Sequence, residues 1–170
     1  MNELDEFLGA GLEHYQVALQ TAARFEDELA KVLDEVVAGR AEPDRFALGD
    51  GQGRLQKARN PASPWVQLGV PVVLPDGAKA NVALGVWWSA PQTTQGCVVY
   101  AGFQKGAERL KFGLVAPPNS GVRIYEGGFN HVFVDVHGGT DIREAAVRAL
   151  DALLAAVELS AEKGQPEAPG

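Results

Sequence analysis

The residues whose types and spacing are best suited to chemistry are His131, Asp135 and His137, which lie between two glycine pairs in the stretch 127–139. They share one parity of this stretch, and the other parity holds three valines, Val132, Val134 and Val136. Such alternation with β-branched residues predicts a half-buried strand. Residues two apart on a strand point the same way, about 6.5–7 Å apart. Asp135 and His137 are therefore candidates for an oriented acid–base pair or for two ligands of a metal ion.

Strand geometry limits what this cluster can do. His131 lies six residues before His137, which is about 20 Å along an extended strand, so the two cannot share one ion. The remaining histidine, His14, falls in a predicted helix and has no sequence reason to meet this strand. The alternative interpretation is a solvated strand face with polar residues near its ends. No metal or other cofactor is expected, and Asp135 with His137 is the only pair that suggests one.

The preceding hairpin decides which side chains join this face. Burial of Ile124 favours a register that aligns it with the valines, because apolar residues pair on the buried side of a half-buried sheet. Trp87 and Trp88 are adjacent, so they must point to opposite faces of their strand. The candidate binding surface on the polar face consists of Trp87, Arg109, Lys111, Arg123, Tyr125 and Phe133. Such residues suit a protein interface, or the stacking of single-stranded nucleic acid.

Charge bears on these alternatives. The net charge of −7 is carried by the two ends, with −5 over residues 1–60 and −3 over 140–170, whereas residues 61–139 carry +1. An acidic protein repels nucleic acid and anionic membranes at long range. We therefore expect no membrane partner. The net charge also argues against a nucleic-acid partner, although the charge of +1 over residues 61–139 does not forbid one.

The remaining signals for chemistry and location are few. Cys97 is the only cysteine, which excludes an internal disulfide, and its apolar neighbours predict a small buried side chain. No Gly-x-Ser-x-Gly motif marks a nucleophilic serine. The first residues are acidic rather than those of a signal peptide, and no apolar run approaches about 18 residues. These features favour a cytoplasmic protein.

The elements that would position these residues begin with a long helix over residues 3–38. Tyr15, Ala22, Leu29 and Val36 recur every seven residues, and Leu12, Leu19 and Leu33 do likewise, with Glu26 interrupting the series. The glycines at 9 and 11 predict a kink or division. The helix is longer than a small sheet needs as cover. Either its stripe packs across the sheet, or residues 12–38 pair with a partner protein or with a second copy.

The rest of the chain predicts an α+β domain. Residues 40–64 read as a connector loop, and residues 65–137 as an antiparallel meander of five to six strands. The expected strands are 65–74, 80–89, 97–103, 108–115, 122–126 and 129–137, with Pro71 placing the first at an edge or breaking it. Thr140 or Asp141 is expected to cap a helix over 140–160, and residues 161–170 to form a disordered tail. Residues 1–160 thus form one domain, with a helical part over 1–39.

Three functions follow from this arrangement. The first is a small acidic, non-enzymatic protein-interaction module, such as an adaptor, an immunity-type inhibitor or a specialised chaperone. The second is an enzyme or small-ligand-binding protein with a pocket around Asp135 and His137 and the 40–64 loop as a lid. The third is single-stranded nucleic-acid binding on the aromatic and basic sheet face.

Overall fold

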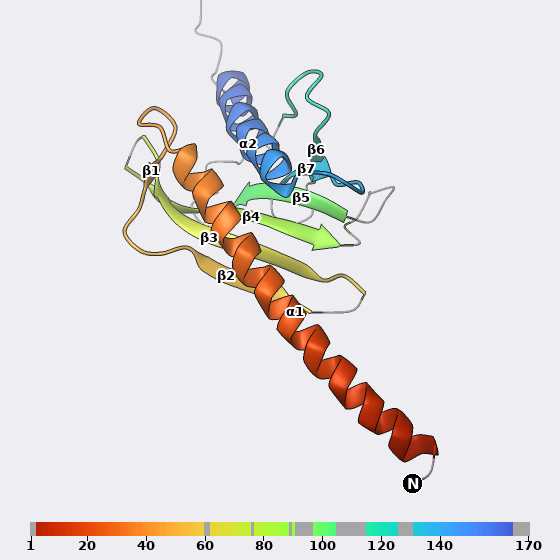
Figure 1. Ribbon diagram of the computed structural model, residues 1–170. Coiled ribbons are helices and arrows are strands. Elements are labelled where there is room, and N and C mark those ends of the chain that lie inside the picture. The colour runs from red at the N-terminus through yellow and green to blue at the C-terminus, as the bar shows by residue number, and fades with distance from the viewer. Residues whose placement is uncertain are drawn as a thin grey trace, which may run out of the picture.

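The structure, a computed structural model, describes residues 3–59, 62–75, 77–88, 90, 97–104, 115–125 and 131–164, without the side chains of Tyr125 and residues 159–164. The expected α+β architecture is confirmed (Figure 1). The elements in chain order are α1 (Glu3–Gly39), β1 (Ala47–Leu48), β2 (Arg54–Ala58), β3 (Trp65–Val73), β4 (Lys79–Trp88), β5 (Cys97–Phe103), β6 (Arg123–Tyr125), β7 (His131–Asp135) and α2 (Ile142–Gly164).

The strands form one antiparallel sheet in the order β1-β3-β4-β5-β7-β6, with β2 also paired to β3. β3, β4 and β5 follow one another as a meander. The order then departs from a simple meander, because β7 lies next to β5 and β6 forms the outer edge. The strand expected over 108–115 lies outside the described residues, apart from Val115, which is in no strand.

Pro71 lies in β3, which is an interior strand and not an edge. β4 pairs along all of β3, whereas β2 pairs with its first half and β1 with its last two residues. The carbonyl of Pro71 accepts a 2.9 Å hydrogen bond from the Gly49 backbone amide on the β1 side. Proline's missing N–H therefore faces the gap between β1 and β2, and the ladder with β4 needs no donor from it.

The segment 40–64, expected as a connector loop, contains β1 and β2. This part of the prediction was wrong, because both strands are short and form only by pairing with β3. Leu55 packs against the core, while Gln56 lies opposite Gln67 of β3. A strand of this kind lacks a strong pattern of its own, since its apolar contacts are supplied by one residue.

The core lies between the sheet and the two helices, which cover the same face (Figure 1). The valine parity of β7 points into this core, as predicted: Val132 and Val134 are buried. β6 pairs with Ile124 opposite Val132, which confirms the predicted register. The other sheet face carries a second buried cluster of Ala90, Val98, Tyr100 and Phe133.

α2 begins as predicted. The carboxylate of Asp141 accepts hydrogen bonds from the backbone amides of Arg143 (2.8 Å) and Glu144 (3.3 Å), which is N-capping. Its apolar stripe is buried against β5 and β7. The helix continues to Gly164, so residues 161–164, expected as the start of a disordered tail, are helical, and residues 165–170 lie outside the described residues.

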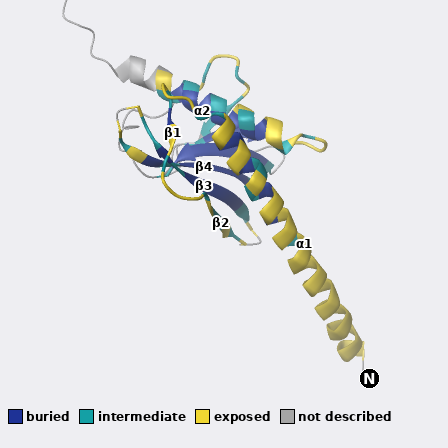
Figure 2. Cartoon of the chain, turned by 60° about the vertical axis from the view of Figure 1, so that its left-hand side comes forward, coloured by how far each residue is buried: buried dark blue, intermediate teal, exposed yellow. Residues whose placement is uncertain are grey.

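α1 is one continuous helix, and the division expected at Gly9 and Gly11 does not occur. Two glycines weaken a helix by about 1 kcal/mol each relative to alanine, but neither brings a competing turn. Only the last third of α1 packs on the sheet, with Leu29, Leu33, Val36 and Val37 buried. The preceding residues project away from the rest of the molecule (Figures 1 and 2). We call residues 3–25 of α1 the arm, and the rest of the described protein the body.

Candidate interaction surface

The side chains on the polar parity of β7 interact with residues of the same sheet. The Asp135 carboxylate accepts a 2.6 Å hydrogen bond from Nη2 of Arg123 on β6. The Arg123 guanidinium also lies 5.9 Å from the centre of the Phe133 ring. His137 lies beyond the end of β7, where its backbone amide donates to the Thr140 hydroxyl at 2.9 Å. The partner that the structure gives to Asp135 is thus Arg123, which the predicted register had placed on the same face.

The aromatic residues of this face pack on one another. Trp87 meets the rings of Tyr100 and Phe133 edge-on, at 6.3 and 6.0 Å between ring centres. Its indole N–H donates a 2.6 Å hydrogen bond to the Ser63 hydroxyl. Phe133 is only 2% exposed. Arg109 and Lys111, also predicted for this surface, lie outside the described residues, as does the side chain of Tyr125.

Sequence reasoning missed Tyr100, which joins this cluster to a polar network. Its hydroxyl donates to Oε1 of Gln67 at 2.7 Å, and Nε2 of Gln67 donates to Oε1 of Gln56 at 2.6 Å. Burial raises the pKa of Tyr100 well above its usual range, so the phenol stays protonated and remains a donor. The ring of His131 stands edge-on to Tyr100, with 5.2 Å between centres. This hydrogen-bond network joins β2, β3 and β5, which gives Tyr100 a structural role.

Two observations bear on metal binding and on nucleophilic chemistry. Among the described residues, no three His, Cys, Asp or Glu side chains come together as a metal-binding group. Burial raises the pKa of the Cys97 thiol, which keeps it protonated and a poor nucleophile near neutral pH.

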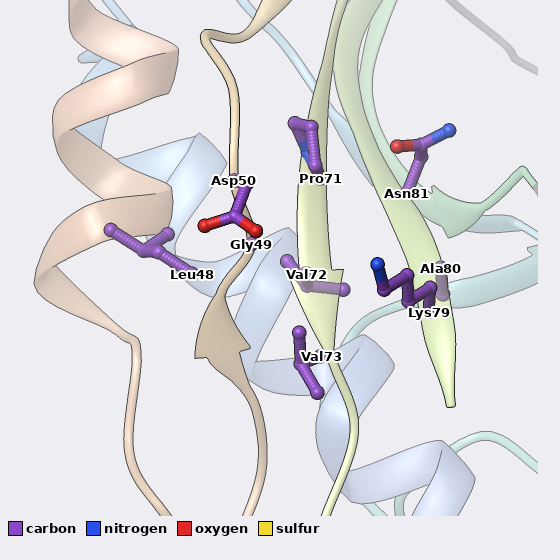
Figure 3. A pocket seen from close by; sticks show the side chains of 9 residues that line it. All are labelled: Leu48, Gly49, Asp50, Pro71, Val72, Val73, Lys79, Ala80 and Asn81. Atoms are coloured by element: carbon purple, nitrogen blue, oxygen red, sulfur yellow. The ribbon is translucent and has the colours of Figure 1, made fainter. Parts of the chain in front are cut away.

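Two shallow cavities flank the loop after β1. One of about 300 Å³ is lined by Asp50 from this loop and by Lys79 and Asn81 from β4 (Figure 3). The other, of about 420 Å³, lies between the loop and α1, where Lys31 and Asp34 line it. Both fall within the size range of ligand pockets, but neither includes the predicted residues of β7.

The arm carries the largest exposed apolar surface in the described part of the chain. Every residue from Glu3 to Thr21 is exposed. At 100° per residue, the large apolar side chains of the arm, apart from Val17, fall on the face that the buried residues of α1 continue. These stripe residues, with their exposed fractions, are Leu4 (61%), Phe7 (72%), Leu8 (53%), Leu12 (71%), Tyr15 (64%), Leu19 (39%) and Phe25 (44%).

Glu26 marks the point where the arm meets the body. It occupies a core position of the seven-residue repeat and is 6% exposed. Arg59 approaches its two carboxylate oxygens at 3.0 and 3.1 Å, and Lys57 forms a second ion pair with it. Burial alone would raise the pKa of Glu26, but hydrogen bonds and positive charge from Lys57 and Arg59 outweigh burial, so its pKa is lowered.

Glu26, which interrupts the predicted repeat, therefore fixes α1 to the end of β2 through Lys57 and Arg59. On the N-terminal side of Glu26, Phe25 packs on Trp88 of β4 with ring centres 6.0 Å apart. Trp88 packs on the helix-covered face, and Trp87 on the other, as their adjacency required. Beyond Phe25, the stripe continues without a cover from the described body.

No protein-family model, curated protein or solved structure matches this chain. In the part of the chain that the structure describes, no helix is long and apolar enough to cross a membrane. The exposed stripe of α1 is the most extensive apolar surface among the described residues.

Proposed function

We propose that this protein is a non-enzymatic interaction module of the adaptor kind, which binds an α-helix along the apolar stripe of its arm. One observation carries the proposal: the stripe that packs against the sheet from Leu29 to Val37 continues on the same helix face to Leu4, and beyond Phe25 it has no cover from the described body. A helix face of this type is covered in folded assemblies, because exposed apolar surface is unfavourable in water.

The extent of the stripe supports an interface. The exposed fractions of its seven large side chains correspond to about four fully exposed residues, or roughly 800 Å² at about 200 Å² each. The largest apolar patch on a typical monomer is about 300–600 Å². A stable interface buries about 800 Å² on each partner.

The shape of the stripe defines the class of partner. From Leu8 to Leu29 the facing positions are spaced alternately by four and three residues, which is the repeat of a coiled coil: Leu8, Leu12, Tyr15, Leu19, Ala22, Glu26 and Leu29. From Leu8 to Ala22 this seam contains no charged residue. The fitting partner is another amphipathic helix with an uncharged seam.

The alternative of a ligand site around Asp135 and His137 has less support. Asp135 is hydrogen-bonded to Arg123, and the two cavities beside α1 and β4 lie elsewhere. The nucleic-acid alternative is likewise weaker, since Phe133 is buried and the chain carries a net charge of −7.

The test is arm-dependent binding. A double variant, Leu12→Lys with Leu19→Lys, puts two charges on the seam while leaving the body untouched. We expect it to lose every partner that the wild-type protein retains from its native extract, and the purified partner to bind wild type but not the variant in calorimetry. Desolvating two lysines in an apolar seam should weaken binding at least a hundredfold.

The matched control is Ala10→Lys with Gln20→Lys, which adds the same charge on the side of α1 away from the seam. This variant should bind as wild type does. The proposal is wrong if the seam variant and the control retain the same partners with the same affinities, because the stripe would then take no part in recognition.

A further inference from the structure

We infer that the arm binds the arm of a second copy of this chain, running antiparallel to it in a symmetric dimer. This inference rests on the proposed function and names the partner. It follows from three features of the structure: the spacing of side chains along the seam, the position of the body, and the charges at the two ends of the arm.

The seam is complementary to itself when reversed. If residues whose numbers add to 27 lie opposite one another, Leu8 meets Leu19 of the other copy, and Leu12 meets Tyr15. Each core position then faces a core position, as helix pairing by knobs into holes requires. The facing pairs are uncharged from Leu8 to Leu19, and Asp5 faces Ala22 where the seam ends. By symmetry each of these two pairs occurs twice, so the interface has four central layers. It uses the same patch on both copies.

The residues beside the seam fit the same arrangement. The flanking pairs lie out of level with the core layers, so their numbers add to 29 on one side of the seam and to 25 on the other. On the first side, Gly11 faces Ala18 of the other copy, so the two backbones can approach closely. At the ends of the same side, Leu4 faces Phe25, which is 44% exposed beyond its contact with Trp88. On the other side, Gly9 faces Gln16. The flanking positions hold no charge, so two acidic chains meet there without like-charge repulsion.

The body excludes the parallel alternative. Past Glu26, the seam is occupied by the chain's own sheet, with Leu29 and Leu33 buried against it. In a parallel dimer in register, the continuing helix of each copy would need the space that the other copy's sheet fills. In the antiparallel arrangement the symmetry axis lies midway between residues 13 and 14. The two bodies then begin about 38 Å apart, on opposite sides of that axis.

Charge at the ends agrees with this direction. The first turn of α1 carries Glu3, Asp5 and Glu6. Antiparallel pairing brings this turn to the level of the other copy's Lys57 and Arg59, whose side chains are 41% and 50% exposed and share one carboxylate, that of Glu26. Two cations against one anion leave positive charge for the acidic turn, and the opposed helix dipoles are also favourable.

Disulfide trapping tests the direction. Leu8→Cys and Leu19→Cys are made separately in a Cys97→Ala background, with tags of different size, and their circular dichroism is compared with wild type. Antiparallel pairing predicts that mixing the two under mild oxidation gives the mixed disulfide, whereas each variant alone gives little. Sedimentation should show a dimer for wild type and for Ala10→Lys with Gln20→Lys, and a monomer for Leu12→Lys with Leu19→Lys.

Each contrary result has a distinct meaning. Efficient disulfides from Leu8→Cys alone would show parallel pairing and overturn the inference. A wild-type monomer at 100 µM or so would overturn self-pairing as well, but the proposed function would stand if a different helical partner required the seam. If Cys97→Ala disturbs the fold, the same cross-links are sought with Cys97 retained and the linked peptides are identified by mass spectrometry.

Discussion

At the scale of single residues, Glu26 decides where the arm ends and the body begins. Replacing it by glutamine removes the negative charge and leaves Lys57 and Arg59 facing an amide. We expect Glu26→Gln to lower the free energy of unfolding by about 1–2 kcal/mol, which is the usual range for charge-assisted hydrogen bonds, reduced by the exposure of both cations. The change is measured by urea denaturation.

Glu28→Gln is the matched control, because Glu28 is exposed on the same helix and pairs only on the surface with Lys31. Its effect should stay below about 0.5 kcal/mol. Equal effects of the two substitutions would show that the buried position of Glu26 gives it no special role.

The comparison of wild type with Glu26→Gln should also depend on pH. The pKa of Glu26 is lowered from its ordinary value of 4.5 in the folded state. The stability that the ionised carboxylate contributes is therefore present above pH 4.5 and is lost as the pH falls through the lowered pKa. The difference in unfolding free energy between wild type and Glu26→Gln should be constant near neutral pH and shrink toward zero in strong acid. A difference that grew on acidification would contradict this account.

Sequence reasoning reached some of these residues and missed others for a physical reason. The valine parity of β7, the register of Ile124 and a cap of α2 at residue 140 or 141 depend on near neighbours, and all were predicted. The partners of Glu26 lie 31 and 33 residues away, and Tyr100 of β5 reaches Gln67 of β3 across the intervening strand β4. Such contacts depend on strand order, which local pattern does not contain.

At the scale of elements, the same contrast appears in α1 and in β1 and β2. The seven-residue repeat was enough to predict the helix and its overhang, because amphipathic periodicity is local. The two short strands were not predicted, because their pairing depends on β3. The continuity of α1 through Gly9 and Gly11 was also missed, and it gives the arm a weak point.

Replacing both glycines by alanine should stabilise the arm helix. An added Cβ would meet nothing within 4 Å at either position. Each change removes roughly 0.5–1 kcal/mol of helix cost, so amide hydrogen exchange across residues 3–22 should slow by about tenfold. Gly138→Ala, equally unobstructed but outside any helix, is the control and should leave exchange in the arm unchanged. Unchanged exchange in the double variant would mean that the arm is not limited by helix propensity.

At the scale of the whole molecule, the chain divides into a body that holds the core and an arm that contributes no buried residue to it. The buried residues of α1 begin at Glu26, and the core cluster draws on α1 from Leu29 onward. The arm therefore costs conformational entropy without intrachain burial to offset it. This imbalance supports the proposed interaction module at the scale of the whole molecule, because a partner on the stripe would supply the missing burial.

Deleting residues 1–22 tests this division. At low micromolar concentration, where association contributes least, we expect the shortened protein to keep the urea midpoint of wild type and to lose self-association. Deleting residues 1–29 instead removes Glu26 and the buried Leu29, and should cost about 3–5 kcal/mol, as loss of a core leucine and an ion pair does. If the shorter deletion destabilised the body as much as the longer one, the arm would belong to the fold of its own chain, and its apolar stripe would need no partner to explain it.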